Sequence, residues 1–193
     1  MTTIVAVSSG RPPAAIAVIR ISGPDAMAAA EALTGGLPAP RAARVRLLRD
    51  DRNMPLDRAL VLAFPGPRSA TGEDLVELHC HGGRAVVAAV EQALLARPGV
   101  RRAEAGEFTR RALMNGRIDL AEAQGLGDLL AAETERQRIA AMGAAEGRIS
   151  RAVQNWLATL SNVAAQVEAT LDFADEDDVA DHGLDPVKTA MVA

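Results

Sequence analysis

TGEDLVELHCHGG, residues 71–83, is the stretch that decides the fold predicted for the first part of the chain. Polar and apolar residues alternate in it, which predicts a half-buried strand over residues 74–80, and two glycines follow this strand. One face of the strand carries Glu77, His79 and His81, because successive side chains point to opposite faces. The other face is apolar and is expected to lie in a core; its residues are Val76, Leu78 and Cys80.

Short β-branched runs alternate with glycine- and proline-rich turns on both sides of this strand, up to residue 118. This pattern predicts a mixed α+β domain over residues 1–118. After residue 118 glycine and proline become rare, and an alanine-rich pattern predicts an all-helical second domain over residues 119–193. The other strands expected in the first domain are at 3–7, 16–22, 44–48 and 58–64. Its expected helices run from Pro24 to Gly35 and over 84–96.

The second domain is predicted to contain one very long helix. Asp119 and Glu122 have the spacing of a capping box, which marks the start of a first helix. No proline occurs between Glu133 and Phe173, and apolar residues recur at alternating steps of three and four from Ile149 onward. A helix of about 40 residues is about 60 Å long, longer than a small domain is wide. Its apolar seam therefore needs a partner, either another copy or a missing part of the same protein.

Composition and charge exclude several classes of protein. The chain has 193 residues, of which 49% are apolar, 24% charged and 2% aromatic. Cys80 is its single cysteine, which excludes a disulfide framework and fits a reducing compartment. No apolar run approaches the roughly 18–20 residues that cross a bilayer, so we expect a cytoplasmic protein without a membrane partner. Acidic residues outnumber basic ones by 25 to 21, which gives the whole chain no general attraction for polyphosphate.

Motifs argue against several kinds of chemical site. Neither a P-loop nor a Gly-x-Ser-x-Gly elbow occurs, so the chain is not expected to hydrolyse a nucleotide by the usual apparatus. A zinc site of His79, Cys80 and His81 is disfavoured, because the strand directs the cysteine away from the histidines. The acidic segment 172–181 lacks the glycine and the closing glutamate of a calcium loop. We expect neither metal ligands nor catalytic residues in this chain.

The residues alone leave two interpretations open for the charged groups of the first domain. The face with Glu77 and His79 is either a solvated strand surface or part of a ligand pocket beside the glycine pair. Arg20 lies within an apolar strand and either guards a sheet edge or is held for an anionic ligand. The arginines around residues 106–109 form either a mixed-charge helix surface or a contact for an anion or nucleic acid.

Five segments in order resemble the tRNA-modification GTPase family MnmE, also called TrmE. They are similar to its N-terminal domain and to the first stretch of its helical domain, and the similarity extends up to residue 173. The segments are TIVA at 3–6, IRISGP at 19–24, TGEDLVELHCHGG at 71–83, GEFT at 106–109 and RALMNGRIDLAEA at 111–123.

The resemblance implies a function for the whole family protein. Its N-terminal domain has a mixed sheet similar to that of folate-binding aminomethyltransferases, forms a homodimer and binds 5-formyltetrahydrofolate or another one-carbon tetrahydrofolate. Its helical domain is interrupted by a Ras-like G domain, which uses GTP, Mg²⁺ and K⁺ at sites outside this chain. With the flavoprotein MnmG, it adds an aminomethyl or carboxymethylaminomethyl group to C5 of the wobble uridine in tRNA. The sequence stops before any G domain, so we expect a truncated piece that is not catalytic alone.

The same resemblance implies three folate contacts, which are Arg20, Glu77 and Arg117. A carboxylate such as Glu77 can accept the amino group and the ring N–H that a pterin presents side by side. An arginine can hold a formyl oxygen or the anionic glutamyl tail. Arg117 stands where the family often has lysine, which keeps the charge and changes the hydrogen-bonding shape.

Two alternatives belong to other functional classes. The first is a free-standing folate-dependent one-carbon transferase, which would need Glu77 or His79 as its acid or base. The second is a structural adaptor for tRNA or for MnmG with a degenerate folate pocket. Binding of a reduced folate separates the adaptor from the other two, and one-carbon transfer without GTP or MnmG identifies the transferase.

Overall fold

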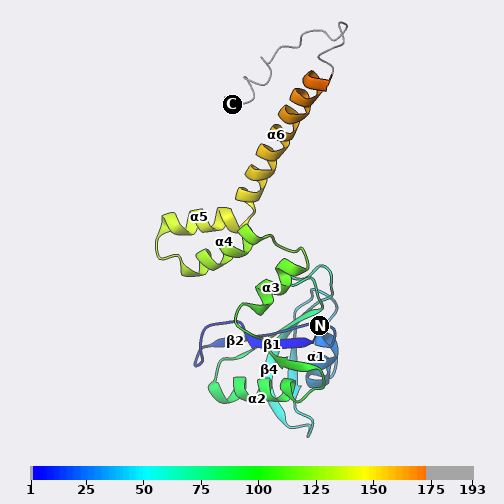
Figure 1. Ribbon diagram of the computed structural model, residues 1–193. Helices are drawn as coiled ribbons and strands as arrows, with labels where there is room; N and C mark the ends of the chain where they lie inside the picture. The colour runs from blue at the N-terminus through cyan, green and yellow to red at the C-terminus, as the bar shows by residue number, and fades with distance from the viewer. Residues whose placement is uncertain (1, 173–193) are drawn as a thin grey trace. The chain divides into compact units, whose positions relative to one another are not determined.

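The computed structural model describes residues 2–172, and the chain folds as two compact units that divide between Ile118 and Asp119 (Figure 1). Residues 173–181 of the acidic segment singled out in the sequence lie outside the described residues. Within the described part of the chain, every helix is too short or too polar to span a bilayer.

The first unit is built on a six-stranded sheet with the strand order β3-β4-β5-β2-β1-β6. Neighbouring strands are antiparallel except β1 and β6, which are parallel. The sheet is therefore mixed, and the predicted α+β class is confirmed. The strand bounds are β1 Thr3–Val7, β2 Ile16–Ser22, β3 Arg44–Arg49, β4 Pro55–Phe64, β5 Leu75–His81 and β6 Val100–Arg102.

Two helices, α1 (Ala26–Thr34) and α2 (Arg84–Leu95), pack on one face of this sheet. Their apolar residues join alternate strand residues in a single core, in which Ile19, Ile21 and Leu78 are fully buried. Burial of a side chain of this size stabilises the fold by about 1.5–3 kcal/mol. The apolar face predicted for the strand at 74–80 is thus the core face of β5.

The opposite face of the sheet, which we call the open face, is covered by neither α1 nor α2. Arg20 on β2 and the pair Glu77 and His79 on β5 lie on it, because they alternate with the core residues along their strands. Two large apolar side chains of this face stay exposed, Ile16 at 60% and Val45 at 58%. The fold therefore places the charged residues on the face opposite the core helices, part of which is accessible while its residues Ile4 and Leu75 are buried.

Two short elements of the first unit were not predicted from the sequence pattern. β6 has three residues and pairs only with β1. α3 (Glu107–Met114) has eight residues and begins after Gly106, whose φ of +73° is the left-handed conformation that glycine adopts readily. Both elements are shorter than the window of about 11 residues over which periodicity is informative.

The second unit contains three helices within the described residues, namely α4 (Leu120–Ala131), α5 (Glu135–Ala145) and α6 (Arg148–Asp172). The capping box predicted at the start of α4 is confirmed, since Asp119 accepts from the Glu122 backbone N–H at 2.8 Å and Glu122 accepts from the Asp119 backbone N–H at 2.8 Å.

The prediction of one continuous helix from Glu133 to Phe173 is wrong. The chain leaves the helical path between α5 and α6 at Gly147, whose φ is +77°. A glycine in the left-handed conformation is a frequent helix terminator and needs no proline. The apolar seam nevertheless exists on α6, where Trp156 is 70% and Leu160 is 64% exposed.

Close packing of α4 against α5 generates a test of the fold. A Cβ added at Gly125 would lie 2.4 Å from the Ala145 backbone N and 2.8 Å from the Ala144 carbonyl carbon, whereas a Cβ at Gly127 meets nothing within 4 Å. We expect Gly125→Ala to lower the free energy of unfolding by about 1–3 kcal/mol through overpacking. Gly127→Ala, the matched control, should raise it by up to about 1 kcal/mol through helix propensity.

Amide hydrogen exchange of α4 and α5 in the full chain measures both effects. Faster exchange in the Gly125→Ala variant and unchanged or slower exchange in the Gly127→Ala variant are expected. Equal exchange in the two variants would contradict the close approach of the helices.

Candidate functional site

An ion pair between two neighbouring strands forms the centre of the candidate site. Arg20 on β2 lies directly opposite Glu77 on β5 in the antiparallel register. Arg20 donates to one carboxylate oxygen, Glu77 Oε1, from Nε at 3.0 Å and from Nη2 at 2.6 Å. The Arg20 side chain is 31% and the Glu77 side chain 17% exposed. The pair is therefore ordered by the sheet and still accessible to a ligand.

The second carboxylate oxygen of Glu77 faces a histidine. His79 lies two residues further along β5, and its Nε2 is 3.3 Å from Glu77 Oε2. Burial alone would raise the pKa of Glu77, but hydrogen bonds from Arg20 and His79, together with their charges, outweigh it and hold that pKa below its ordinary value. Glu77 is therefore an ionised acceptor of hydrogen bonds near neutral pH.

An aromatic ring lies against the same arginine. Phe108 belongs to the first turn of α3, and the Arg20 Cζ atom lies over its ring, 5.9 Å from the centroid. This distance is within the range of a cation–π contact. The site predicted from the sequence includes Arg20 and Glu77 but omits this ring. The only sequence feature that could have indicated Phe108 is its place in the family segment GEFT at 106–109.

Arg117, the third predicted contact, is exposed and is held by a different part of the unit. Its Nε donates to the Ser69 carbonyl oxygen at 3.1 Å, in the loop that precedes β5. Gly72 of the same loop has φ of +78°, and a Cβ there would lie 3.2 Å from Arg117 Cγ. Among the described residues, no hydrogen bond or ion pair joins Arg117 to Arg20 or Glu77. The structure thus brings two of the three predicted residues together and anchors the third on the loop before β5.

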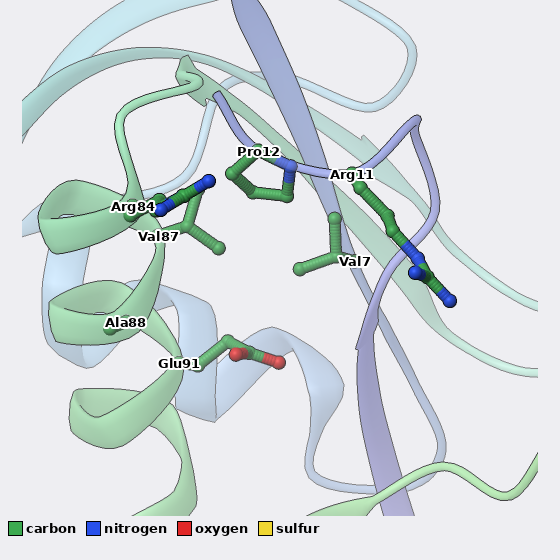
Figure 2. Close-up of a pocket in the computed structure, with 7 residues that line it drawn as sticks. All are labelled: Val7, Arg11, Pro12, Arg84, Val87, Ala88 and Glu91. Atoms are coloured by element: carbon green, nitrogen blue, oxygen red, sulfur yellow. The ribbon is translucent and has the colours of Figure 1, made fainter. Parts of the chain in front are cut away.

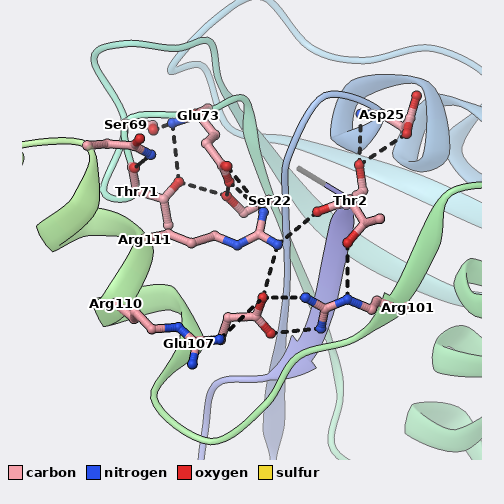
Figure 3. A network of polar contacts seen from close by, with 12 residues as sticks. Thr2, Ser22, Asp25, Ser69, Thr71, Glu73, Arg101, Glu107, Arg110 and Arg111 are labelled. Carbon is pink, nitrogen blue, oxygen red and sulfur yellow. Dashed lines mark hydrogen bonds and ion pairs between the residues drawn. The ribbon is translucent and has the colours of Figure 1, made fainter.

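A buried network of charges, shown in Figure 3, fixes α3 against the sheet. Glu107 is 3% exposed and accepts from Arg101 Nη2 at 2.5 Å, from Arg111 Nη2 at 3.0 Å and from the Glu104 backbone N–H at 2.9 Å. Hydrogen bonding from Arg101 outweighs burial and, with the other donors, lowers the pKa of Glu107 to about 2. This side chain is therefore ionised throughout the physiological range.

Arg111 carries the network on to other elements. It is 4% exposed, and its Nη1 donates to Glu73 Oε2 at 2.9 Å while its Nη2 donates to the Thr2 carbonyl oxygen at 2.8 Å. Glu73 in turn accepts from Ser22 Oγ, at the end of β2, at 2.9 Å. The network thus ties α3 to β6, to the N-terminal segment and to the loop before β5. The sequence left open whether the arginines here form a helix surface or a contact for an anion or nucleic acid. The structure buries Arg111 inside the unit.

The other members of the histidine and cysteine group do not join the site. His81 is 72% exposed at its side chain, and its Nδ1 lies 2.7 Å from Asp57 Oδ1. Burial is the largest cause that raises the pKa of the Cys80 thiol to about 12, so the thiol stays protonated. No cluster of three or more metal-ligating side chains occurs among residues 2–172.

A separate cavity of about 380 Å³ lies between α2, β1 and the loop that follows β1 (Figure 2). The loop contributes Arg11 and Pro12, and α2 contributes Arg84, Val87 and Glu91 to its lining. None of the three predicted folate contacts lines this cavity. The cavity is therefore distinct from the ion pair of the open face.

Comparison with known proteins assigns both units. Residues 3–117 match the family described as the GTP-binding protein TrmE N-terminus, and residues 120–192 match the MnmE helical domain. The two matches follow the order of the two units, and they define a chain of the class that carries a TrmE-type N-terminal domain followed by an MnmE helical domain. The chain belongs to the MnmE family of tRNA modification GTPases.

Individual relatives agree with the family. The tRNA modification GTPase MnmE of Novosphingobium aromaticivorans is 62% identical over 178 residues, which cover 92% of this chain and 41% of the relative. That of Erythrobacter litoralis is 62% identical over 179 residues, with 93% and 42% covered, and that of Sphingopyxis alaskensis is 65% identical over 161 residues, with 83% and 38% covered. The chain thus spans about two fifths of the length of these relatives.

The buried carboxylate predicts how stability responds to acid. Because the pKa of Glu107 falls from 4.5 to about 2 on folding, its contribution is complete above pH 4.5 and is lost as the pH falls toward 2. A shift of this size corresponds to about 3 kcal/mol. We expect Glu107→Gln to lower the free energy of unfolding at pH 7 by about 3 kcal/mol, since Arg101 and Arg111 lose a charged acceptor while Arg111 keeps its contact with Glu73, and to flatten the pH dependence below pH 4.5.

Urea unfolding of the full chain between pH 7 and pH 3 measures this effect. Glu104→Gln is the matched control, because the Glu104 side chain is 66% exposed and its ion pair with Arg110 lies at the surface. An acid response of Glu107→Gln equal to that of wild type would show that Glu107 is not the buried anion of this unit.

Proposed function

We propose that the chain is the N-terminal part of an MnmE-type tRNA modification GTPase and that its α+β unit binds 5-formyltetrahydrofolate or another one-carbon tetrahydrofolate. The observation that carries the proposal is the Arg20–Glu77 pair on the open face, at positions that match the family motifs. A ligand pocket needs only a few convergent polar groups on a rigid support. The paired strands β2 and β5 supply that support.

Glu77 has the chemistry that a pterin requires. Its carboxylate is ionised, and Arg20 contacts only one of its two oxygens. The contact of His79 with the other oxygen is long, at 3.3 Å, and is replaced at low cost by a ligand N–H. Glu77 would accept the amino group and the ring N–H of the pterin, and Arg20 would donate to an oxygen of the one-carbon group or the tail.

Arg117, in the segment between α3 and α4, completes the proposed site. Its Nε is engaged by the Ser69 carbonyl, and a guanidinium has four further N–H donors. The side chain is exposed, so these donors can reach the charged tail of a folate. Arg117 would then add a long-range attraction for the ligand without a contact to Glu77.

The open face supports a homodimer. Ile16 and Val45 are exposed apolar residues on the same face as the proposed folate site. We propose that a second copy of the chain covers them, because burial of exposed apolar area is the main driving force of association. The dimer would bring two folate sites near its interface.

The remaining activities belong to the proposed whole protein. They are GTP hydrolysis with Mg²⁺ and K⁺ at sites outside this chain, partnership with MnmG, and addition of an aminomethyl or carboxymethylaminomethyl group to C5 of the wobble uridine of tRNA in the cytoplasm. The family membership supports these proposals, and the chain contributes the folate-binding and dimerising part.

A free-standing one-carbon transferase is less well supported by the geometry. Its lowered pKa keeps Glu77 ionised near neutral pH, so it carries no proton to donate as a general acid, and His79 makes only a long contact with it. The adaptor alternative makes no use of the ordered ion pair on the open face. One-carbon transfer by the chain without GTP or MnmG would favour the transferase, and absence of folate binding would favour the adaptor.

Substitution of the carboxylate tests the proposal. We expect Glu77→Gln to weaken binding of 5-formyltetrahydrofolate by roughly 10- to 100-fold, because a charged hydrogen bond contributes about 1.5–3 kcal/mol. Isothermal titration calorimetry on the full chain measures the Kd, and circular dichroism checks that the fold is retained.

Glu91→Gln is the matched control for this experiment. Glu91 is on α2, is 18% exposed at its side chain and pairs with Arg102 at 3.7 Å, so it resembles Glu77 in burial and in having an arginine partner. The Kd of the Glu91→Gln variant for 5-formyltetrahydrofolate should stay within roughly twofold of the wild-type value, as expected for loss of a weak surface pair. Wild-type affinity in the Glu77→Gln variant would remove the pterin contact from this residue.

A further inference from the structure

We propose that Phe108 is a positioning residue of the ligand site, whose ring holds the Arg20 guanidinium in the orientation that meets the ligand. This inference rests on the proposed folate function of the Arg20–Glu77 pair. Phe108 would act on the ligand through its contact with Arg20, because its side chain has no hydrogen-bonding group.

The Arg20 side chain is held from two directions. Glu77 Oε1 contacts one edge of the guanidinium, at Nε and Nη2. The Phe108 ring approaches the same guanidinium, with Cζ over the ring at 5.9 Å from its centroid. The contact with Glu77 alone leaves the guanidinium free to rotate about the N···O axis, whereas a second contact with the ring restricts that rotation.

This arrangement leaves donors free for a ligand. A guanidinium has five N–H groups, and Glu77 uses one on Nε and one on Nη2. Among the described residues, no hydrogen-bond partner engages the N–H groups of Nη1 or the second N–H group of Nη2. An oxygen of an anionic or carbonyl group of the ligand fits these donors.

The ring itself is held by the buried ion network. Phe108 follows Glu107 directly in the first turn of α3, and Glu107 is bonded to Arg101 and Arg111 and is 3% exposed. The same network reaches Ser22, two residues after Arg20 on β2, through Glu73. The ring and the guanidinium are thus attached to one rigid frame from both sides, which suits a contact whose purpose is orientation.

Phe64 offers a matched control in the same unit. Its ring lies under Arg41 with the same separation, 5.9 Å from Cζ to the centroid. Arg41 donates instead to the carbonyl oxygen of Arg68 and has no contact with Glu77 among the described residues. Loss of an aromatic ring at position 64 removes a cation–π pair of the same separation that involves neither Arg20 nor Glu77.

Titration of 5-formyltetrahydrofolate into the full chain tests the proposal with three variants. Phe108→Leu keeps an apolar side chain and loses the π face, and we expect it to weaken binding by roughly three- to tenfold, as a partly exposed cation–π contact would. Phe108→Trp keeps an aromatic face and should restore affinity to within roughly twofold of wild type, since tryptophan is the best ring for this contact. Phe64→Leu should also bind as wild type does.

A ligand-independent measurement accompanies the titration. In the free protein, loss of the ring current next to Arg20 should shift the Arg20 Nε–H proton resonance in Phe108→Leu, and this resonance should stay in place in Phe64→Leu. Wild-type affinity together with an unmoved resonance in Phe108→Leu would overturn the proposal. Equal loss in Phe108→Leu and Phe108→Trp would overturn it too, because the role would then be packing. Failure of the wild-type chain to bind the folate would overturn the proposed function, and with it this inference.

Discussion

The antiparallel register between β2 and β5 is the constraint on which the site depends. It sets Arg20 opposite Glu77 and, in the same step, directs Ile19, Ile21 and Leu78 into the core. A slip of one residue would exchange the two faces of β2, so the burial of the core enforces the ion pair. The hydrophobic effect thereby positions a polar site that by itself contributes little stability, because both charges border solvent.

Charge is used in two different ways in the first unit. In the buried network, Glu107 and Arg111 satisfy each other and are less than a tenth exposed, so the interactions are fixed and costly to break. On the open face, Glu77 retains one oxygen with only a long contact to His79. The first arrangement holds α3 in place, and the second leaves hydrogen-bonding capacity for a ligand. The difference follows from burial, since the residue types are the same.

Much of the first unit follows from local patterns, and the site follows only in part. The strand that carries Glu77 is visible as an alternation over seven residues, and the family motif adds Arg20. Their contact joins residues 57 apart in the chain, so no local pattern contains it. Glu107 and Arg111 have the spacing of a helical pair, but their burial depends on side chains from three other segments. The sequence pattern predicts a helix through Gly147, because no proline interrupts it. Gly147 ends that helix instead, in a conformation that depends on the packing of α4 and α6 around it.

The central claim is that the carboxylate of Glu77 receives a pterin on the open face of the sheet. A crystal structure of the chain soaked in 5-formyltetrahydrofolate tests it most directly. The account predicts the pterin amino group and ring N–H within hydrogen-bonding distance of Glu77, with the Arg20 guanidinium donating to a ligand oxygen. Density for the folate in the cavity between α2 and β1, with Glu77 still bonded to His79 and facing solvent, would contradict it.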